Sequence, residues 1–395
     1  LRISIFREFE KTMNTDMHYE MFVPTRTLFG AGTLNKLGEQ KLPGKKALLM
    51  ISNGKSTRAS GTLARTEEQL RKAGVESVLF DKVEANPLKT TVMAGGAAAR
   101  EHGCDFIVAL GGGSVMDAAK GVAVVAANDG GLWDYVAFGT GKGKPIANRP
   151  LPIVAVTTTA GTGSETDAGG VITNAETREK TALFDEALFP VLAVVDPELT
   201  KTVPAKFTAF QGFDALFHST EACISRRANL MSDMYALTAI ENVARFLPRA
   251  VRDGNDIEAR TRVSWGNTLS GSVMCVGSCT SEHSLEHAMS AFHQELPHGA
   301  GLIMISKAYY AHFVRRGVCP ERFVRMAKAM GAEDASVPED FLRALEKLQN
   351  DCGVGDLKMS DYGIVPEEFP EMARNAKEAM GFLFPNDPAP LSDED

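Results

Sequence analysis

Short, uninterrupted runs of apolar residues recur through the first half of the chain, and helix-like patterns separate them. The runs are KALLMIS (46–52), SVLF (77–80), DFIVAL (105–110), LPIVAVT (151–157) and VLAVV (191–195). The helix-like stretches are 59–73, 88–102 and Ser114 to about Asn128. A strand that is apolar on both faces has to be covered on both faces, which is typical of a parallel sheet between helices. The first half therefore predicts an α/β dinucleotide-binding domain with a parallel, Rossmann-like sheet.

The pattern changes after Pro204, where long stretches with helical apolar spacing take over. These stretches are 208–224, 231–248, 258–275, 282–291, 300–315 and 338–351. We therefore expect an α/β domain over 17–203 and an all-α C-terminal domain over 204–395. Residues 1–16 are interpreted as a mobile leader, and the Pro- and acid-rich tail PNDPAPLSDED is expected to be frayed.

Length and charge exclude some classes of protein. The chain has 395 residues and a net charge of −8, which favours two domains and argues against a general nucleic-acid binder. No apolar run approaches the roughly 20 residues of a membrane span, and the N-terminus lacks the apolar segment of a signal peptide. Six scattered cysteines without CxxC pairs indicate reduced, buried thiols. We expect a cytoplasmic protein without membrane partners, in which Cys275 and Cys279 serve core packing rather than metal binding.

A glycine turn between a strand and a helix, LGGGSVMDAAKG (110–121), is a candidate phosphate site. Gly111, Gly112 and Gly113 would let an anion approach the backbone, and Ser114 is a suitable N-cap for the helix whose positive end faces it. The turn is neither the GxGxxG fingerprint, because Met116 replaces the third glycine, nor a P-loop. A glycine-rich turn without a ligand is the alternative, but the end of a parallel strand is where open α/β sheets bind ligands.

A second small-residue loop, TTTAGTGSETD (157–167), follows another predicted strand. Its hydroxyls suit hydrogen bonds to the ribose, phosphate or carboxamide of a cofactor. The candidates are Thr157, Thr158, Thr159 and Thr162. A plain loop is the alternative.

Histidines are concentrated in one stretch: four of the eight lie within 281–299. His283 and His287 are four residues apart and share a helix face, as do Asp214 and His218 in an otherwise apolar helix. His298 follows Pro297, in a turn before a helix expected to begin near Gly301. Each histidine alone could be a hydrogen-bonded core or surface residue. Buried carboxylate and imidazole groups are costly unless they are paired or bind a metal, so the joint pattern favours a site for Fe²⁺ or Zn²⁺.

Several motifs together resemble the iron-containing (group III) alcohol dehydrogenase family, from about residue 20 to 385. They are GGGSVMDAAK (111–120), TTTAGTGSE (157–165), VVDPEL (194–199), GFDALFHSTEA (212–222) and HSLEHAMSAFHQELPHGAGL (283–302). The resemblance implies a reversible hydride transfer between NAD(P)(H) and a small primary alcohol or aldehyde. The divalent ion, Fe²⁺ in the family's name, would lower the pKa of the alcohol or polarise the aldehyde.

The resemblance also implies site residues. The metal ligands would be Asp214, His218, His283 and His298. His287 matches a histidine beside the substrate and the nicotinamide, and we predict that it relays a proton, since imidazole titrates near physiological pH; an orienting role is the alternative. Among the remaining positions, Lys180 matches a lysine near the cofactor, Asp117 is expected to order the phosphate turn, and Leu199 to line the cofactor or substrate pocket with Phe138 and Phe292.

The cofactor preference depends on the end of the first predicted strand, MISNGKST (50–57). NAD-preferring members of the family carry an aspartate where Gly54 lies here, between Asn53 and Lys55. Without a carboxylate to repel a 2′-phosphate, and with Lys55 or Arg58 to attract it, NADP(H) should be used at least as well as NAD(H).

Two other functions share parts of this pattern. One is a zinc-dependent, glycerol-dehydrogenase-like polyol oxidoreductase, and the other is a metal- or nucleotide-binding sensor without turnover. The complete ligand set and both small-residue loops favour an enzyme. The resemblance further implies a homodimer or a higher homo-oligomer. Expected substrates are short-chain aldehydes, diols, hydroxyaldehydes and small acidic aldehydes.

Overall fold

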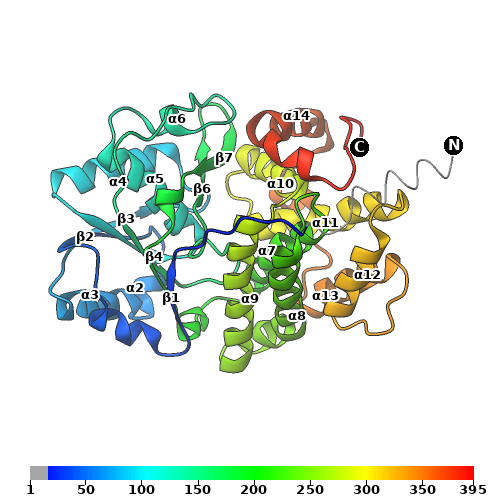
Figure 1. The fold of residues 1–395 in the computed structure, drawn as a ribbon, viewed down its shortest axis with the longest axis horizontal. Helices are drawn as coiled ribbons and strands as arrows, with labels where there is room; N and C mark the ends of the chain where they lie inside the picture. Colours follow the sequence, from blue (N-terminus) through cyan, green and yellow to red (C-terminus); the bar gives the residue numbers. More distant parts are fainter. Residues whose placement is uncertain (1–16) are drawn as a thin grey trace.

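A parallel six-stranded sheet forms the first half of the protein (Figure 1). The computed structural model describes residues 17–395, so the predicted leader 1–16 lies outside the described residues. The strands follow the order β1-β8-β5-β4-β2-β3, and neighbouring strands of the sheet are parallel. Their bounds are β1 (Arg26–Phe29), β2 (Lys46–Ser52), β3 (Glu76–Val83), β4 (Phe106–Gly111), β5 (Ile153–Thr157) and β8 (Leu192–Val195). The predicted apolar runs form β2, β3, β4, β5 and β8, whereas β1 was not predicted.

Both faces of the sheet are covered, which explains the continuous apolar runs. Leu48 and Met50 of β2 lie in one apolar core with residues of α4 (Lys89–Glu101) and α5 (Gly113–Ala127). Ala47 and Leu49 of the same strand lie in a second core with Leu63 and Leu70 of α3 (Thr62–Lys72). Successive side chains of a strand point to opposite faces. The predicted doubly covered sheet is confirmed.

A small hairpin interrupts this pattern and was not predicted. β6 (Gly169–Asn174) and β7 (Glu179–Phe184) pair antiparallel. β7 lies against α10 (Ser281–Phe292) and α14 (Phe369–Met380). The hairpin therefore carries part of the α/β half onto the helical half, close to the histidine-rich stretch.

The second half is helical, as predicted. The six predicted stretches form α7 (Ala205–Ile224), α8 (Leu230–Arg252), α9 (Ile257–Val276), α10, α11 (His298–Arg315) and α13 (Glu339–Asp351). Two more helices, α12 (Pro320–Ala329) and α14, were not predicted. α7 packs against α8, α9 and α11, and its residues from Gly212 to Ile224 are all buried. Polar groups in this helix therefore need partners inside the protein.

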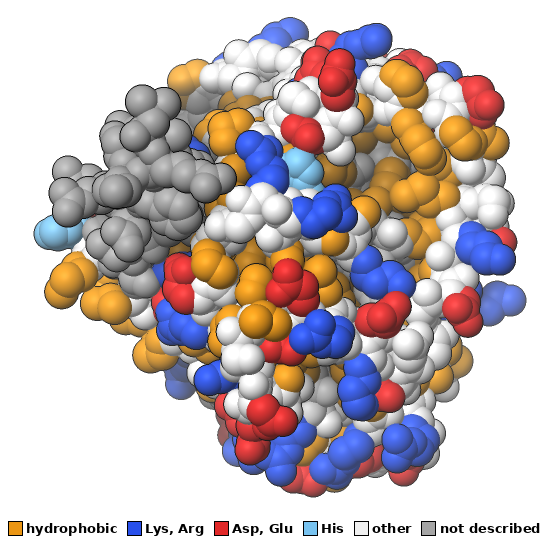
Figure 2. All heavy atoms as spheres, turned by 90° about the vertical axis from the view of Figure 1, so that its right-hand side faces the viewer, with side chains coloured by type: hydrophobic (Ala, Val, Ile, Leu, Met, Phe, Trp, Pro, Cys, Tyr) orange, Lys and Arg blue, Asp and Glu red, His pale blue; other side chains and the backbone are white. Residues whose placement is uncertain are grey.

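Three expectations concern the C-terminal tail, membrane-spanning helices and surface charge. The tail is not frayed up to Ala389, because the carboxylate of Asp387 is buried and accepts hydrogen bonds from Ser281 N and the Tyr309 hydroxyl. Within residues 17–395, no helix is long and apolar enough to cross a membrane. On the face of the helical half in Figure 2, acidic and basic side chains are intermixed rather than gathered by sign.

Candidate metal and cofactor site

Four side chains that are far apart in sequence meet around one carboxylate oxygen. Asp214 and His218 come from α7, His283 from α10 and His298 from the start of α11. Asp214 Oδ1 lies 3.4 Å from His218 Nδ1, 3.6 Å from His283 Nε2 and 3.5 Å from His298 Nε2. The structure thus brings the four predicted ligands together. His298 is the first residue of α11 rather than part of a preceding turn, because the helix begins directly after its N-cap residue, Pro297.

The donor set fits a divalent cation. Among the described residues, Asp214 Oδ1, His218 Nδ1 and His283 Nε2 are buried and have no hydrogen-bond partner. A buried polar atom without a partner costs about 1–3 kcal/mol, and three of them converging on one point are suited to bind a cation. One oxygen and three imidazole nitrogens suit borderline ions such as Fe²⁺ and Zn²⁺.

The ionisation of two of these groups agrees with metal binding. Burial acts to raise the pKa of Asp214, but the electrostatic effects and hydrogen bonds of the surrounding histidines outweigh it and hold the pKa well below its usual value. Burial lowers the pKa of His218 to about 3. A charged carboxylate and a neutral imidazole are the forms that bind a metal.

Two buried glutamates orient the histidines, and sequence reasoning missed both. Glu221 Oε1 pairs with His283 Nδ1, and Glu286 Oε2 pairs with His298 Nδ1. Each pair leaves the Nε2 of its histidine directed at Asp214, an arrangement common around protein-bound metals. Their signal in the sequence was a glutamate three residues after a predicted ligand histidine in each motif, HSTEA and HSLEH.

His287 lies beside the four ligands rather than among them. Its ring centroid is 5.3 Å from that of His298, and its buried Nδ1 has no hydrogen-bond partner within residues 17–395. Burial, followed by the charges of Lys180 and His298, lowers the pKa of His287 well below its usual value. The expectation that this ring titrates near physiological pH is therefore wrong, since the ring is neutral there. Its role as a proton relay stays a prediction.

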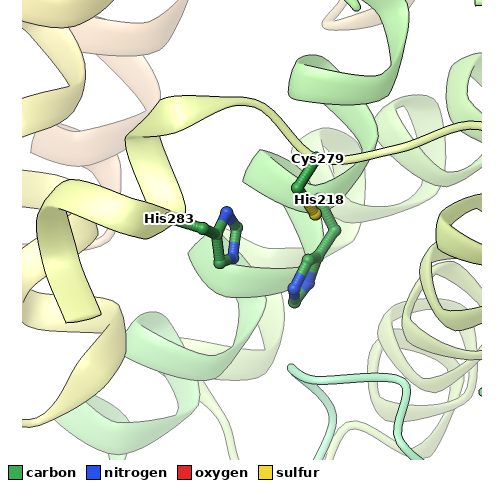
Figure 3. Close-up of side chains that lie close together, drawn as sticks. All are labelled: His218, Cys279 and His283. Atoms are coloured by element: carbon green, nitrogen blue, oxygen red, sulfur yellow. The ribbon is translucent and has the colours of Figure 1, made fainter. Parts of the chain in front are cut away.

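Cys279 is a close neighbour of the site. Its sulfur and one nitrogen each of His218 and His283 lie within 4.8 Å of one another, and Figure 3 shows the three side chains together, with Cys279 in the loop before α10. Cys279 also packs against Met380 and Leu383. These apolar contacts agree with the core-packing role expected from the sequence. That role does not explain why the sulfur lies close to the two imidazoles.

Lys180 faces the metal site from the hairpin. Its Nζ lies 3.3 Å from Glu286 Oε2 and 3.5 Å from His298 Nδ1, and its side chain is buried. The sequence predicted a lysine near the cofactor. The structure places it against the carboxylate that orients a metal ligand.

The glycine turn leads directly into α5. The helix begins at Gly113 with Gly112 as its N-cap, and no side chain of the described residues caps it. The prediction that Ser114 is the N-cap is wrong by two residues, because the glycines continue the chain into the helix without a capping side chain. First-turn N–H groups of a helix lack acceptors within the helix and can bind an anion.

The same glycines also make room for the second loop. A Cβ on Gly112 would lie 2.7 Å from Thr159 Oγ1, and one on Gly113 would lie 2.3 Å from Thr162 Cγ2. On Gly111 it would clash with Val115 at 2.5 Å. Packing against the second loop thus requires Gly112 and Gly113, and packing against the first turn of α5 requires Gly111.

Hydrogen bonds fix the turn and the second loop. Asp117 accepts hydrogen bonds from Ser164 Oγ (2.7 Å) and Val171 N (3.1 Å), which fits its expected role in ordering the turn. Thr157 Oγ1 donates to Thr159 O at 3.0 Å. Lys120 is fully buried. Its Nζ donates to Ser164 Oγ, Asp167 Oδ1 and Gly169 O.

The second loop is fastened to α9 by buried polar groups. Gly163 N donates to Asn267 Oδ1 at 2.8 Å. Glu165 Oε1 accepts hydrogen bonds from Asn267 Nδ2 (2.7 Å) and Thr268 Oγ1 (3.0 Å). The loop that carries candidate cofactor hydroxyls is therefore held at a set position relative to the helical half.

A cavity of about 190 Å³ lies between the end of β2, the second loop and α7. Its described lining is rich in hydroxyls and contains no carboxylate: Ser56, Thr57, Ser60, Thr62, Thr158, Thr159, Leu199, Thr202, Val203, Pro204, Phe207 and Gln211. Three predicted residues, Thr158, Thr159 and Leu199, thus share one cavity. Its position at the carboxyl ends of β2 and β5 suits a nucleotide.

The residues expected to set cofactor preference lie beside this cavity. Asn53, Gly54 and Lys55 connect β2 to the short helix α2 (Ser56–Ala59). Asn53 N is already bonded to Val83 O at 2.8 Å. Arg58 pairs with Asp81 at the surface, and the attraction of a 2′-phosphate by Lys55 or Arg58 stays a prediction.

The loop after α10 bridges the two halves. Gln294 Nε2 donates to Asn86 O at 2.7 Å, and Asn86 Nδ2 donates to Gln294 O at 2.9 Å. Of the predicted pocket walls, Phe138 stacks on Phe382 with ring centroids 4.0 Å apart, and Phe292 lies under the guanidinium of Arg178. Neither ring belongs to the described lining of the 190 Å³ cavity, which includes Leu199, and their place in a pocket wall stays a prediction.

Comparison with known proteins agrees with this geometry. The model of the family described as iron-containing alcohol dehydrogenase matches residues 24–197, and the model of the C-terminal part of the Fe-containing family matches 208–395. The chain is 35% identical to 1,3-propanediol dehydrogenase of Klebsiella pneumoniae over 93% of this chain and 96% of that protein. It is 31% identical to NAD-dependent methanol dehydrogenase of Bacillus methanolicus, over 90% and 93%.

Solved structures are similar over nearly the whole chain. An archaeal halo-thermophilic alcohol dehydrogenase from a Red Sea brine pool superposes with a TM-score of 0.91 at 34% identity, covering 96% of this chain and 98% of that one. A 1,3-propanediol oxidoreductase has a TM-score of 0.86 at 33% identity, covering 95% and 97%.

Proposed function

The chain belongs to the iron-containing alcohol dehydrogenase family, and from this premise we propose which reaction it performs and with which residues. As a member it is an oxidoreductase acting on CH–OH groups. We propose that it transfers a hydride reversibly between NAD(P)H and a small primary alcohol or aldehyde. Fe²⁺ would be held by Asp214, His218, His283 and His298. The observation that supports this most is the unpartnered Asp214 Oδ1 with an imidazole nitrogen of each histidine 3.4–3.6 Å away.

The residues around the ion divide the remaining work. The bound ion would supply Lewis acidity, lowering the pKa of the alcohol or polarising the aldehyde. The glycine turn before α5 and the hydroxyl-lined cavity would bind and orient the cofactor. The buried, neutral ring of His287 is suited to hold the hydroxyl proton of a substrate through a hydrogen bond.

The substrate class follows from the relatives and the site. Two similar enzymes act, by their names, on 1,3-propanediol and methanol. We propose that short primary alcohols, diols and their aldehydes are substrates here.

The test is an anaerobic assay of NAD(P)H oxidation by a panel of such aldehydes. The protein is first treated with a chelator and then loaded with Fe²⁺ or Zn²⁺, and Asp214→Asn serves as the inactive control. We expect turnover only after a metal is restored. Cofactor and metal binding without turnover of any aldehyde would favour a sensor, and turnover with zinc and glycerol alone would favour a polyol oxidoreductase.

The cofactor preference can be tested separately. We propose that NADPH is used at least as well as NADH, because the described cavity lining has no carboxylate and Lys55 follows Gly54. Gly54→Asp should lower kcat/KM for NADPH at least about tenfold, the equivalent of about 1.4 kcal/mol, and change that for NADH little. A preference of the wild type for NADH above about a hundredfold, near 2.7 kcal/mol, would contradict the proposal.

The expected homo-oligomer and cytoplasmic location stay predictions, to be checked by mass photometry and cell fractionation.

A further inference from the structure

Glu286 is a fully buried carboxylate that lies between the two histidines of α10 in sequence. Ser290 Oγ donates to its Oε1, while His298 Nδ1 and Lys180 Nζ donate to its Oε2. Both oxygens therefore have partners, whereas Asp214 Oδ1 has none among the described residues. This contrast separates the two carboxylates: Asp214 presents a free oxygen to a cation, and Glu286 acts as an acceptor for side chains.

The packing around Glu286 leaves room for a carboxylate at this position. Gly301 lies three residues after His298 in the first turn of α11. A Cβ on Gly301 would lie 2.7 Å from Glu286 Cγ and 2.9 Å from its Oε1. The glycine thus allows α11 to approach the glutamate closely enough for His298 to reach it.

Lys180 supplies the positive charge that a buried carboxylate needs. Its side chain on β7 is 5% exposed, and that of Glu286 is 0% exposed. Removing one member of a buried pair leaves an unpaired charge, which is strongly destabilising. Lys180 contacts the same carboxylate oxygen that accepts the N–H of His298. The pair also joins the hairpin of the α/β half to the metal site.

We propose that Glu286 is a positioning residue for the metal: it fixes the ring of His298 so that Nε2 faces Asp214, and Lys180 keeps Glu286 in place. This rests on the proposed function in that His298 is taken as a metal ligand. The role is conferred by the glutamate of HSLEH together with the lysine of β7.

The test measures metal binding rather than activity alone. Co²⁺ affinity and the visible cobalt spectrum are measured for the full-length wild type, Glu286→Ala, Glu286→Gln, Lys180→Met and the double variant Lys180→Met with Glu286→Gln. Glu286→Ala should weaken cobalt binding about 10- to 100-fold. Glutamine keeps an oxygen that can accept the His298 N–H, but it leaves Lys180 unpaired. The double variant, which has no unpaired charge, should therefore recover most of the affinity.

Glu368→Gln is the matched control. Glu368 also pairs with a histidine, His293, at 3.1 Å, but neither belongs to the ligand set. Its cobalt affinity should equal that of the wild type. Thermal unfolding of each variant distinguishes loss of the ligand from loss of the fold: a variant with the wild-type melting temperature and weakened cobalt binding supports the proposal.

The outcomes separate the two proposals. Wild-type cobalt affinity and an unchanged spectrum in folded Glu286→Ala, with turnover intact, would overturn the positioning role and leave the proposed function standing. The expected affinity pattern in a protein that turns over no aldehyde would overturn the proposed function and leave the positioning role standing. A wild type that binds no divalent ion would overturn both.

Discussion

Replacing Glu165 with glutamine should stabilise the protein at pH 8 and have little effect on stability near pH 4.5. Glu165 is fully buried in the loop that follows β5. Its Oε1 accepts two hydrogen bonds from α9, while its Oε2 has no partner in the described part of the chain. Burial raises the pKa of this carboxyl from 4.5 to about 7. Glutamine keeps the accepting oxygen and cannot ionise.

The magnitude follows from the two pKa values. Below pH 4.5 the carboxyl is protonated in both the folded and the unfolded protein and contributes no pH dependence. As the pH rises from about 4.5 to about 7, the unfolded chain releases the proton while the folded protein retains it, so stability falls. At about 1.4 kcal/mol per pH unit, the full loss is about 3 kcal/mol.

The assay is urea unfolding of the wild type and Glu165→Gln at pH 5 and pH 8. For each protein, the free energy of unfolding at pH 5 is subtracted from that at pH 8. Other titrating groups contribute equally to this change in both proteins, so they cancel when the two changes are compared. The variant should gain about 2 to 3 kcal/mol relative to the wild type between these pH values. A gain below about 1 kcal/mol would refute the reasoning, since Glu165 would then ionise in the folded protein as it does in the unfolded chain.

Three further outcomes are expected. Gly113→Ala, whose Cβ would lie 2.3 Å from Thr162 Cγ2, should weaken NADPH binding in a fluorescence titration and leave cobalt affinity unchanged; unaltered NADPH affinity would show that the loop packing is not required. With an oxygen and three nitrogens as ligands, cobalt-loaded protein should lack a sulfur-to-cobalt charge-transfer band. A band that Cys279→Ser abolishes and Cys275→Ser keeps would instead make Cys279 a ligand. Chelation should lower the free energy of unfolding by about 3 kcal/mol relative to protein with free metal at a hundredfold excess over Kd, and Asp214→Asn should remove this difference.

The strands of the sheet were predictable because burial on both faces leaves a local signal. β2 and β4 are buried almost throughout, and each appears as an apolar run in the sequence. β1 has four residues and only partial burial, so it carries no such run. The strands β6 and β7 pair with each other and lack a sustained alternation, and their place is set by contacts with α10 and α14.

The ligands were predictable for a different reason. Asp214 with His218 and His283 with His287 are polar pairs at helical spacing in apolar surroundings, and the family motifs identify which of them bind the metal. The glutamates that orient the histidines were missed, because the sequence does not distinguish a helical glutamate that faces water from one that faces an imidazole. Helix ends were the least certain feature, as the shifts at Ser114 and His298 show.

The sequence does not predict how the two halves are placed relative to each other, and the site depends on this placement. The ligands come from α7, α10 and α11, whereas the candidate cofactor loops follow β4 and β5. Buried or half-buried hydrogen bonds join the halves near the site: Glu165 to α9, Lys180 to Glu286, and Asn86 to Gln294. In each case a residue of the α/β half meets an element of the helical half that adjoins the metal ligands. The distance from cofactor to metal is therefore a property of this interface, and a substitution there can change hydride transfer without touching either ligand set.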